Sequence, residues 1–234
     1  MPTITYVDEG FGEVILFLHG WGQNKEMMLP LIEELKCNYR CIVLDLPGFG
    51  ESPFNDAETL NLYTEKLNEF LKGKGIKPTY IVGHSFGGKV AVNYILKYGG
   101  VKGLILLASP ILKPKRTVKY FFNIYKYKFK KKLNLAIKEY GSYDYKNCSK
   151  NMKSFFVNVV ITHFDKSIRL IESPVLLIWG NKDDKVPLSK AKSLNKKLKN
   201  SKLYIQKGGH FAYLENIEFT RLIIQQFIRG NDND

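Results

Sequence analysis

The sequence predicts an α/β fold, in which helices cover both faces of a mostly parallel, twisted sheet. Short apolar runs rich in β-branched residues recur along the chain, and stretches with helical spacing of apolar residues separate them. Several runs, such as "PVLLIWG" at 174–180, are apolar at nearly every position, which is typical of parallel strands buried on both faces. Because 234 residues suffice for one sizeable core, we expect residues 1–234 to form a single domain.

The N-terminal half contains four predicted strands and three predicted helices. Each strand is a run of apolar and β-branched residues that ends at a glycine or at polar turn residues. The first helix is indicated by Met28, Leu31, Ile32 and Leu35, whose spacing places them on one helical face. The strands are expected at 4–7, 14–20, 40–46 and 79–83, and the two further helices at about 60–72 and 88–98.

The C-terminal half adds three predicted strands and two predicted helices around a segment of different composition. The strands are expected at 101–109, 174–180 and 201–208, and the helices at about 189–198 and 215–229. The segment 111–166 separates the first two of these strands. Because strands and helices alternate regularly outside it, we expect it to be an insertion between core strands.

Side chains that can carry chemistry stand directly after three of the predicted strands. Ser85 follows the fourth strand, Asp183 and Asp184 follow the sixth, and His210 follows the last. Loops that leave the carboxyl ends of parallel strands gather at one edge of the sheet, where ligands bind. A serine, an acid and a histidine are therefore expected at that edge, in the chain order Ser, Asp, His.

The stretch "GHSFG" at 83–87 fits the pattern G-x-S-x-G between a strand and a helix. Glycines on both flanks permit a sharp turn that holds Ser85 at a strained backbone angle and lifts its hydroxyl clear of the sheet. This is how a nucleophile is presented to a substrate. The alternative interpretation is a glycine-bounded turn that carries an ordinary serine.

Taken together, these features resemble the α/β-hydrolase superfamily over essentially the whole chain except the insertion. Three features match that superfamily: the chain order Ser, Asp, His, the turn around Ser85 at 83–87 (the nucleophile elbow), and the turn "HGWG" at 19–22. "HGWGQN" and "DLPGFGES" are most similar to the small carboxylesterases typified by the pimeloyl-carrier-protein methyl ester esterases. The resemblance implies an α/β-hydrolase fold, a helical lid at 111–166, and a serine esterase that needs neither a metal nor a cofactor.

The resemblance also implies a catalytic triad of Ser85, His210 and Asp183. His210 would take the proton of the Ser85 hydroxyl and later give it to the leaving group, while the acid fixes the tautomer of the ring. The family pattern G-x-x-D-x-x-V-P selects Asp183 for the acid, and Asp184 remains the alternative. Asp45, which ends an earlier strand, is expected to anchor the loop "PGFG".

An oxyanion hole is implied at the same edge of the sheet. Its donors would be the backbone N–H groups of Phe86, the residue after the nucleophile, and of Trp21, in the turn after the second strand. Trp21 as a plain core residue is the alternative. Among the other histidines, His84 is expected to line the elbow and His19 to be structural. His163 is expected at the surface, with contact to the substrate as the alternative.

The positive charge of the chain is concentrated in one segment. The formal net charge is +14, and residues 111–153 hold 13 basic and two acidic residues, which gives +11 for that segment alone. Apolar and aromatic residues recur there at about helical spacing, from Val118 to Leu133, with lysines at 119, 126, 128 and 130–132 among them.

This basic segment has several interpretations. It is a lid with solvated lysines, a docking surface for an acidic carrier protein or an anionic acyl substrate, or a surface that lies on an anionic membrane. No nucleic-acid-binding motif accompanies the charge, so a nucleic acid is not the expected partner.

Composition and apolar patterning bear on whether the protein spans a membrane, is secreted or contains disulfides. No run of about 18 consecutive apolar residues predicts a transmembrane segment, and the first residues lack the basic and then apolar pattern of a secretion signal. Cys37, Cys41 and Cys148 do not suggest a disulfide framework, and reduced structural thiols in a cytoplasmic protein fit them better.

The function predicted from the sequence is that of a serine carboxylesterase acting on a small-molecule ester. Three alternatives stay open. The same triad could hydrolyse thioesters or carbon–carbon bonds, or act in a lyase. The fold could also serve a ligand-binding or receptor protein with little turnover, or a membrane-docking lipase.

Overall fold

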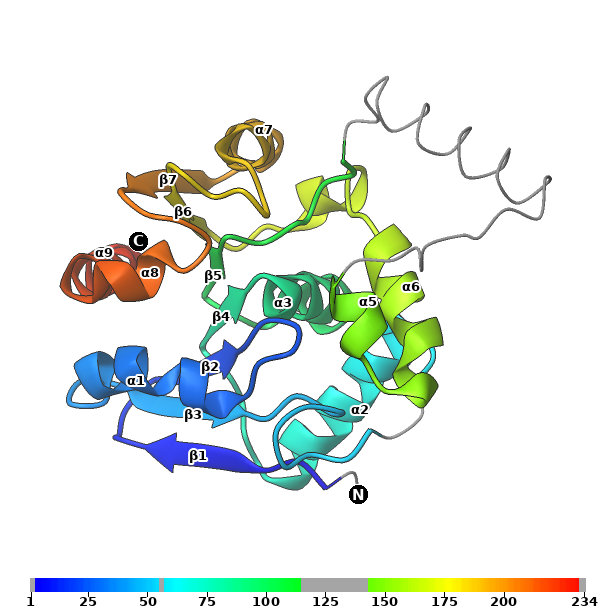
Figure 1. Cartoon of the computed structure of the whole chain (residues 1–234). Coiled ribbons are helices and arrows are strands. Elements are labelled where there is room, and N and C mark those ends of the chain that lie inside the picture. Colours follow the sequence, from blue (N-terminus) through cyan, green and yellow to red (C-terminus); the bar gives the residue numbers. More distant parts are fainter. Residues whose placement is uncertain (1–2, 55–56, 115–142, 232–234) are drawn as a thin grey trace.

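The computed structural model describes residues 3–54, 57–114 and 143–231, whose centre is a seven-stranded sheet. The strands are Tyr6–Glu9 (β1), Val14–Leu18 (β2), Arg40–Leu44 (β3), Tyr80–His84 (β4), Gly103–Leu107 (β5), Val175–Gly180 (β6) and Ser201–Gln206 (β7). Their order is β1-β3-β2-β4-β5-β6-β7 (Figure 1). Every neighbouring pair is parallel except β1 and β3, so the predicted mostly parallel sheet is confirmed.

The helices follow the predicted alternation with the strands. They are Leu29–Leu35 (α1), Leu60–Gly73 (α2), Phe86–Tyr98 (α3), Tyr143–Asn147 (α5), Lys153–Ile161 (α6), Leu188–Lys197 (α7), Ala212–Glu215 (α8) and Ile217–Asn231 (α9). Short 3₁₀ turns occur at Lys25–Met27 (η1), Lys150–Met152 (η2) and Ser167–Leu170 (η3). The helix predicted at 215–229 differs in one respect, because Asn216 leaves the helical region at φ −134°, ψ 59° and separates α8 from α9.

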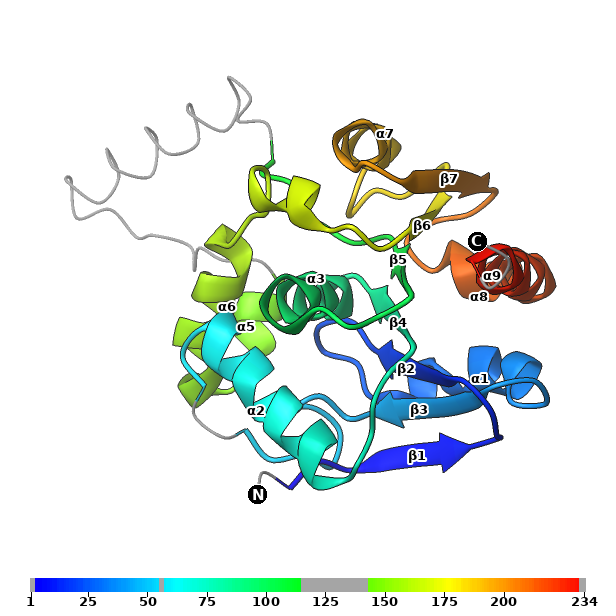
Figure 2. The same cartoon turned by 180° about the vertical axis from the view of Figure 1, so that it is seen from behind.

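The two largest apolar clusters of the described residues lie one on each face of the sheet. On one face, alternate residues of the central strands contact buried side chains of α1 and α9, such as Leu31 and Ile224. On the other face, the remaining alternate residues contact α2, α3 and α7, through side chains such as Leu67, Val90 and Leu194. Figure 1 and the opposite view in Figure 2 show the helices on both sides of the sheet. This double cover explains why the central strands are apolar at almost every position.

The expected lid at 111–166 is described only in part. Its predicted helical stripe from Val118 to Leu133, with the lysines among it, lies outside the described residues. The described portion contains α5, η2 and α6, and both views place α5 and α6 beside α2 and α3 (Figures 1 and 2). Among the helices of the described residues, none is both long and apolar enough to cross a membrane.

Candidate active site

The loops that leave β2, β3, β4, β6 and β7 meet at the carboxyl edge of the sheet, as predicted for parallel strands. Register explains the meeting, since Leu18 pairs with Gly83 and with Leu44, so β2, β3 and β4 end at nearly the same level. The side chains that follow these strands are therefore brought together by the sheet itself.

Ser85 stands between β4 and α3 in the backbone geometry predicted for it. Its φ of 49° and ψ of −112° are unusual for a residue with a side chain, and its side chain is partly exposed. A Cβ on Gly83 would lie 2.6 Å from the Gly88 Cα, and one on Gly87 would lie 2.1 Å from the Leu18 carbonyl oxygen. The turn therefore requires glycine on both sides of the serine.

His210 and Asp183 form a hydrogen-bonded pair at the ends of two neighbouring strands. The His210 Nδ1 lies 2.9 Å from the Asp183 Oδ2. The other carboxylate oxygen of Asp183 accepts hydrogen bonds from the backbone N–H groups of Lys185 and Val186, at 2.9 and 2.8 Å. Asp183 is buried and Asp184 is exposed, so the structure brings Asp183 and not Asp184 to the histidine.

His210 contacts the elbow through His84. The ring of His84, the residue before the serine, has its centroid 4.9 Å from that of His210, and its Nε2 lies 3.2 Å from the His210 carbonyl oxygen. The hydrogen bonds of the described residues do not include one between Ser85 Oγ and the His210 ring. Such bonds are often long in unliganded sites and tighten when a substrate binds.

Two backbone N–H groups beside Ser85 are available to a ligand. Phe86 is the first residue of α3, so its N–H has no partner within the helix. Trp21 lies in the turn after β2, and in the described part of the chain neither its N–H nor that of Phe86 donates a hydrogen bond. Both groups are therefore available for the oxyanion role that the sequence predicts for them. The Trp21 ring also packs on the Phe86 ring, with centroids 5.3 Å apart.

His19 has the structural contacts that were predicted for it. The Leu46 N–H donates to the His19 Nε2 at 3.0 Å, so the ring proton is on Nδ1, which donates to the Gly20 carbonyl oxygen at 2.8 Å. Burial lowers the pKa of His19 to about 4, which keeps the ring neutral. The ring ties the turn after β2 to the loop after β3.

Sequence reasoning missed Gln23, whose side chain contacts both the turn after β2 and the elbow. Its Oε1 accepts the Gly20 N–H at 2.9 Å and lies 3.2 Å from the His84 Nδ1. Burial lowers the pKa of His84 to about 3, so its single ring proton can serve either Gln23 or the His210 carbonyl oxygen. Gln23 lies within "HGWGQN", but nothing in that motif indicates that its amide contacts the elbow.

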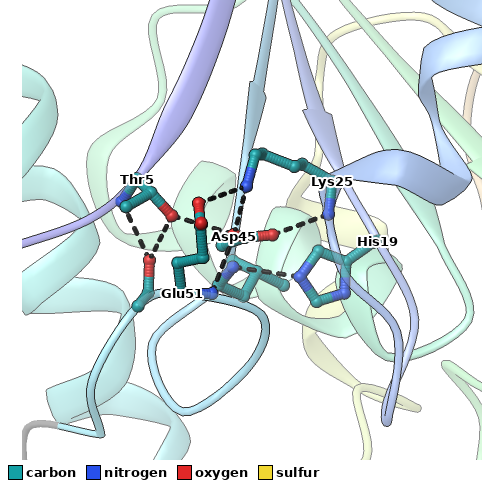
Figure 3. Close-up of polar contacts among 7 residues, drawn as sticks. Thr5, His19, Lys25, Asp45 and Glu51 are labelled. Atoms are coloured by element: carbon teal, nitrogen blue, oxygen red, sulfur yellow. Dashed lines mark hydrogen bonds and ion pairs between the residues drawn. The ribbon is translucent and has the colours of Figure 1, made fainter.

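Asp45 anchors the loop after β3, as predicted, and also the turn after β2 (Figure 3). Its carboxylate accepts hydrogen bonds from the Lys25 N–H and ammonium at 2.7 and 2.8 Å, and from the Glu51 N–H at 3.0 Å. The Thr5 hydroxyl donates a fourth at 2.8 Å. Burial alone would raise the pKa of Asp45, but the hydrogen bonds outweigh it and hold the pKa below its usual value.

We expect Asp45→Asn to destabilise the protein by about 2–3 kcal/mol, because it leaves the Lys25 ammonium without its buried partner. A lowered folded-state pKa stabilises the fold above about pH 4 and loses that effect as the pH falls through the folded-state pKa. Urea unfolding from pH 7 to pH 3 should therefore show a steeper loss for the parent protein than for Asp45→Asn. Asp8→Asn, which breaks the exposed pair with Arg40, should cost less than about 1 kcal/mol. Equal costs for both variants would contradict the anchoring role.

A cavity of about 400 Å³ opens beside the turn that carries Trp21. Trp21, Gly22, Gly48 and Phe49 form its inner wall, and residues of 144–152 close the other side. Phe156 of α6 packs edge-on against the Trp21 ring, with centroids 4.8 Å apart. The described part of the predicted lid therefore contributes to the space next to the candidate oxyanion donors.

Comparison with known proteins shows which of them this chain is similar to. The sequence model of the alpha/beta hydrolase fold matches residues 13–131 and 113–217. The chain is 29% identical to a pimeloyl-[acyl-carrier protein] methyl ester esterase of Wigglesworthia glossinidia brevipalpis, over 94% of this chain and 95% of that protein. It is 26% identical to a 2-hydroxy-6-oxo-6-phenylhexa-2,4-dienoate hydrolase of Comamonas testosteroni, over 97% of this chain and 91% of that protein.

Solved structures agree on the fold. An esterase from Exiguobacterium antarcticum superposes with a TM-score of 0.76 at 20% identity, over 97% of this chain and 95% of its own. The family match covers most of the chain, and the mostly parallel sheet with helices on both faces is the one expected from the sequence. The chain therefore belongs to the alpha/beta hydrolase fold family.

Proposed function

We propose that this hydrolase cleaves carboxylic esters through an acyl-enzyme on Ser85, with His210 as the base and Asp183 as the acid that orients it. The observation that carries the proposal is the 2.9 Å hydrogen bond between His210 Nδ1 and Asp183 Oδ2 at the edge of the sheet where the strained Ser85 stands. That bond leaves the His210 Nε2 free to accept a proton.

The proposed reaction runs in two halves. His210 Nε2 takes the proton of the Ser85 hydroxyl while Oγ bonds to the ester carbonyl carbon, and the N–H groups of Trp21 and Phe86 stabilise the oxyanion. The C–O bond to the alcohol then breaks, and His210 protonates the departing oxygen. A water molecule, deprotonated by the same ring, attacks the acyl-enzyme, and His210 returns the proton to Ser85 as the acid leaves.

The names of the relatives support ester hydrolysis and also a second candidate reaction, hydrolysis of a carbon–carbon bond. One relative is named as a methyl ester esterase of an acyl-carrier protein, which supports a carboxylic ester and a small-molecule acyl chain for this chain too. Another is named as a hydrolase of a dienoate, a reaction at a carbon–carbon bond. Hydrolysis of such a bond by the same three residues is the second candidate.

A series of p-nitrophenyl esters of increasing acyl length tests the proposal. The cavity beside Trp21, about 400 Å³, has room for roughly a dozen water-sized groups, so short and medium acyl chains should give the highest kcat/KM. Turnover of a vinylogous 1,5-diketone but of no ester would favour the second candidate. Binding of esters without any turnover would contradict the enzyme proposal and favour a binding protein.

The basic segment supports an acidic partner, such as an acyl-carrier protein or an anionic surface. Of the +14 formal charges, +11 come from residues 111–153. A strongly positive surface raises the encounter rate with an acidic partner, and salt screens that advantage. This proposal rests on the sequence, since lysines 130–132 lie outside the described residues.

Reversing Lys130, Lys131 and Lys132 to Glu is expected to lower kcat/KM for a carrier-linked or anionic ester about tenfold at low salt. A small neutral ester should be hydrolysed nearly as before, and the loss should shrink at high ionic strength. Reversal of the exposed Lys196, Lys199 and Lys202 makes the same change of charge elsewhere and should have little effect. An equal loss of kcat/KM on both esters would mean that the substitutions disrupt the fold of the predicted lid. No loss on either ester would mean that these lysines form only a solvated face.

A further inference from the structure

A second cavity, of about 280 Å³, borders the loop after β6 that carries Asp183 and is lined by positive side chains. Lys89 of α3, Lys190 of α7, Lys185 and His163 contribute to its walls. Proline, leucine and valine side chains make up the rest, and no carboxylate belongs to the lining that the structure describes. The cavity is therefore both cationic and apolar.

The most unusual of these groups is Lys89, which is only 3% exposed. Its ammonium donates to the carbonyl oxygens of Val159 and Thr162, at 2.6 and 2.8 Å. Both acceptors are neutral backbone groups at the end of α6, so Lys89 caps that helix. Within the described residues it has no carboxylate as a partner, although buried charges are normally paired with one. The cost of this burial lowers the pKa of Lys89 to about 8.

His163 adds a polar group to the same cavity. Its Nδ1 is buried and has no hydrogen-bond partner among the residues that the structure describes. Burial lowers the pKa of His163, and the nearby charges of Lys89, Lys113 and Lys190 lower it further, against Asp165, which raises it. Asp165 accepts the Lys113 N–H at 2.9 Å from outside the lining. Among the described residues that act on His163, one acid thus stands against three lysines.

Two lining residues of the cavity, Lys89 and Val186, connect it to the candidate catalytic residues. Lys89 follows Ser85 by one helical turn of α3, about 6 Å along the axis, and side chains on a helix lean toward its N-terminus. Val186, another lining residue, donates its N–H to Asp183 at 2.8 Å. A group held here would therefore lie next to the loop that positions His210.

We propose that this cavity binds the carboxylate of an acidic ester, so that the enzyme acts on half-esters of short aliphatic dicarboxylic acids. The inference rests on the proposed ester hydrolysis for its catalytic consequence but not for the binding itself. A carboxylate would accept a hydrogen bond from the Lys89 ammonium and one from the His163 ring, and its methylenes would contact the apolar wall. The volume has room for roughly nine water-sized groups, enough for such a chain.

Calorimetric titration of the parent protein with glutarate and with its neutral diamide tests the binding. We expect glutarate to bind more tightly than the diamide, and the Kd of glutarate to rise about tenfold or more in Lys89→Met. Because Lys89→Met also leaves two carbonyl oxygens unpaired, Lys190→Gln provides a second variant, for which a several-fold rise is expected. Lys192→Gln, an exposed position on the same helix outside the cavity, is the matched control and should not change the Kd.

The outcomes separate this proposal from ester hydrolysis itself. Unchanged glutarate affinity in both cavity variants, or inorganic phosphate binding as tightly as glutarate, would overturn the carboxylate site. In the catalytic arm, kcat/KM for monomethyl glutarate relative to methyl butyrate should fall in Lys190→Gln and not in Lys192→Gln. Turnover of both esters without glutarate binding would reject the cavity alone, and glutarate binding without ester turnover would reject the proposed hydrolysis alone.

Discussion

Ser85→Ala is expected to lower kcat for ester hydrolysis by roughly four to six orders of magnitude, which is the loss seen when a triad nucleophile is removed. The covalent step needs the hydroxyl oxygen, and no neighbouring group supplies an equivalent nucleophile in the proposed reaction. The measurement is the steady-state rate on the best p-nitrophenyl ester from the chain-length series.

The same variant should remain folded. Ser85 is partly exposed and its hydroxyl makes no hydrogen bond in the described part of the chain, so alanine removes little stability. Thermal unfolding monitored by circular dichroism should give a Tm within a few degrees of the parent. Ester turnover at the parent rate by folded Ser85→Ala would contradict the role of the elbow, because the hydroxyl would then be dispensable.

Asp183→Asn should have the second largest effect, a loss in kcat of roughly three to four orders of magnitude. The carboxylate accepts the Nδ1 proton of His210 and stabilises the positive ring that forms in the transition state, whereas an amide can hold the ring in the wrong tautomer. Binding of the ester should be much less affected, so the loss should appear in kcat rather than in KM.

Asp184→Asn is the matched control for this prediction. The two residues are adjacent, but Asp184 is exposed and Asp183 is buried against His210. The control should keep nearly the parent rate. The opposite pattern, with Asp184→Asn inactive and Asp183→Asn active, would transfer the role of the acid to Asp184.

The sequence predicts the fold well because periodicity and burial act locally. Runs that are apolar at nearly every position, such as "PVLLIWG", are typical of strands covered on both faces, and all seven predicted strands became part of the sheet. The glycines at 83 and 87 permit the close backbone approach that the turn at Ser85 requires, so the elbow also follows from local chemistry.

Contacts between distant segments could not be predicted in the same way. Gln23 reaches the elbow 61 residues away, and Lys89 reaches the end of α6 over a separation of 70 residues. No periodicity encodes such pairings, since they depend on how the loops and the helix α6 pack on the folded sheet. The break between α8 and α9 at Asn216 was not predicted either, because the residues on both sides of it favour a helix.

The partner of the predicted lid at 111–166 could not be predicted from the sequence either. Charge and aromatic spacing indicated a basic helical insertion at 111–166, and the described part of it forms α5 and α6. Composition gives the sign of the charge but not the partner that it meets. The expected helix with lysines at 130–132 therefore stays a prediction, which the charge reversals above test.

Mass spectrometry of the protein after reaction with a fluorophosphonate tests the central claim most directly. Such a reagent phosphonylates a serine only when a base removes its proton and an oxyanion hole holds the phosphoryl oxygen. We predict one adduct per chain, located on Ser85 by peptide mapping, and none on Ser85→Ala or on His210→Ala. An adduct on another residue, or no adduct on a protein that still hydrolyses esters, would contradict nucleophilic catalysis by Ser85.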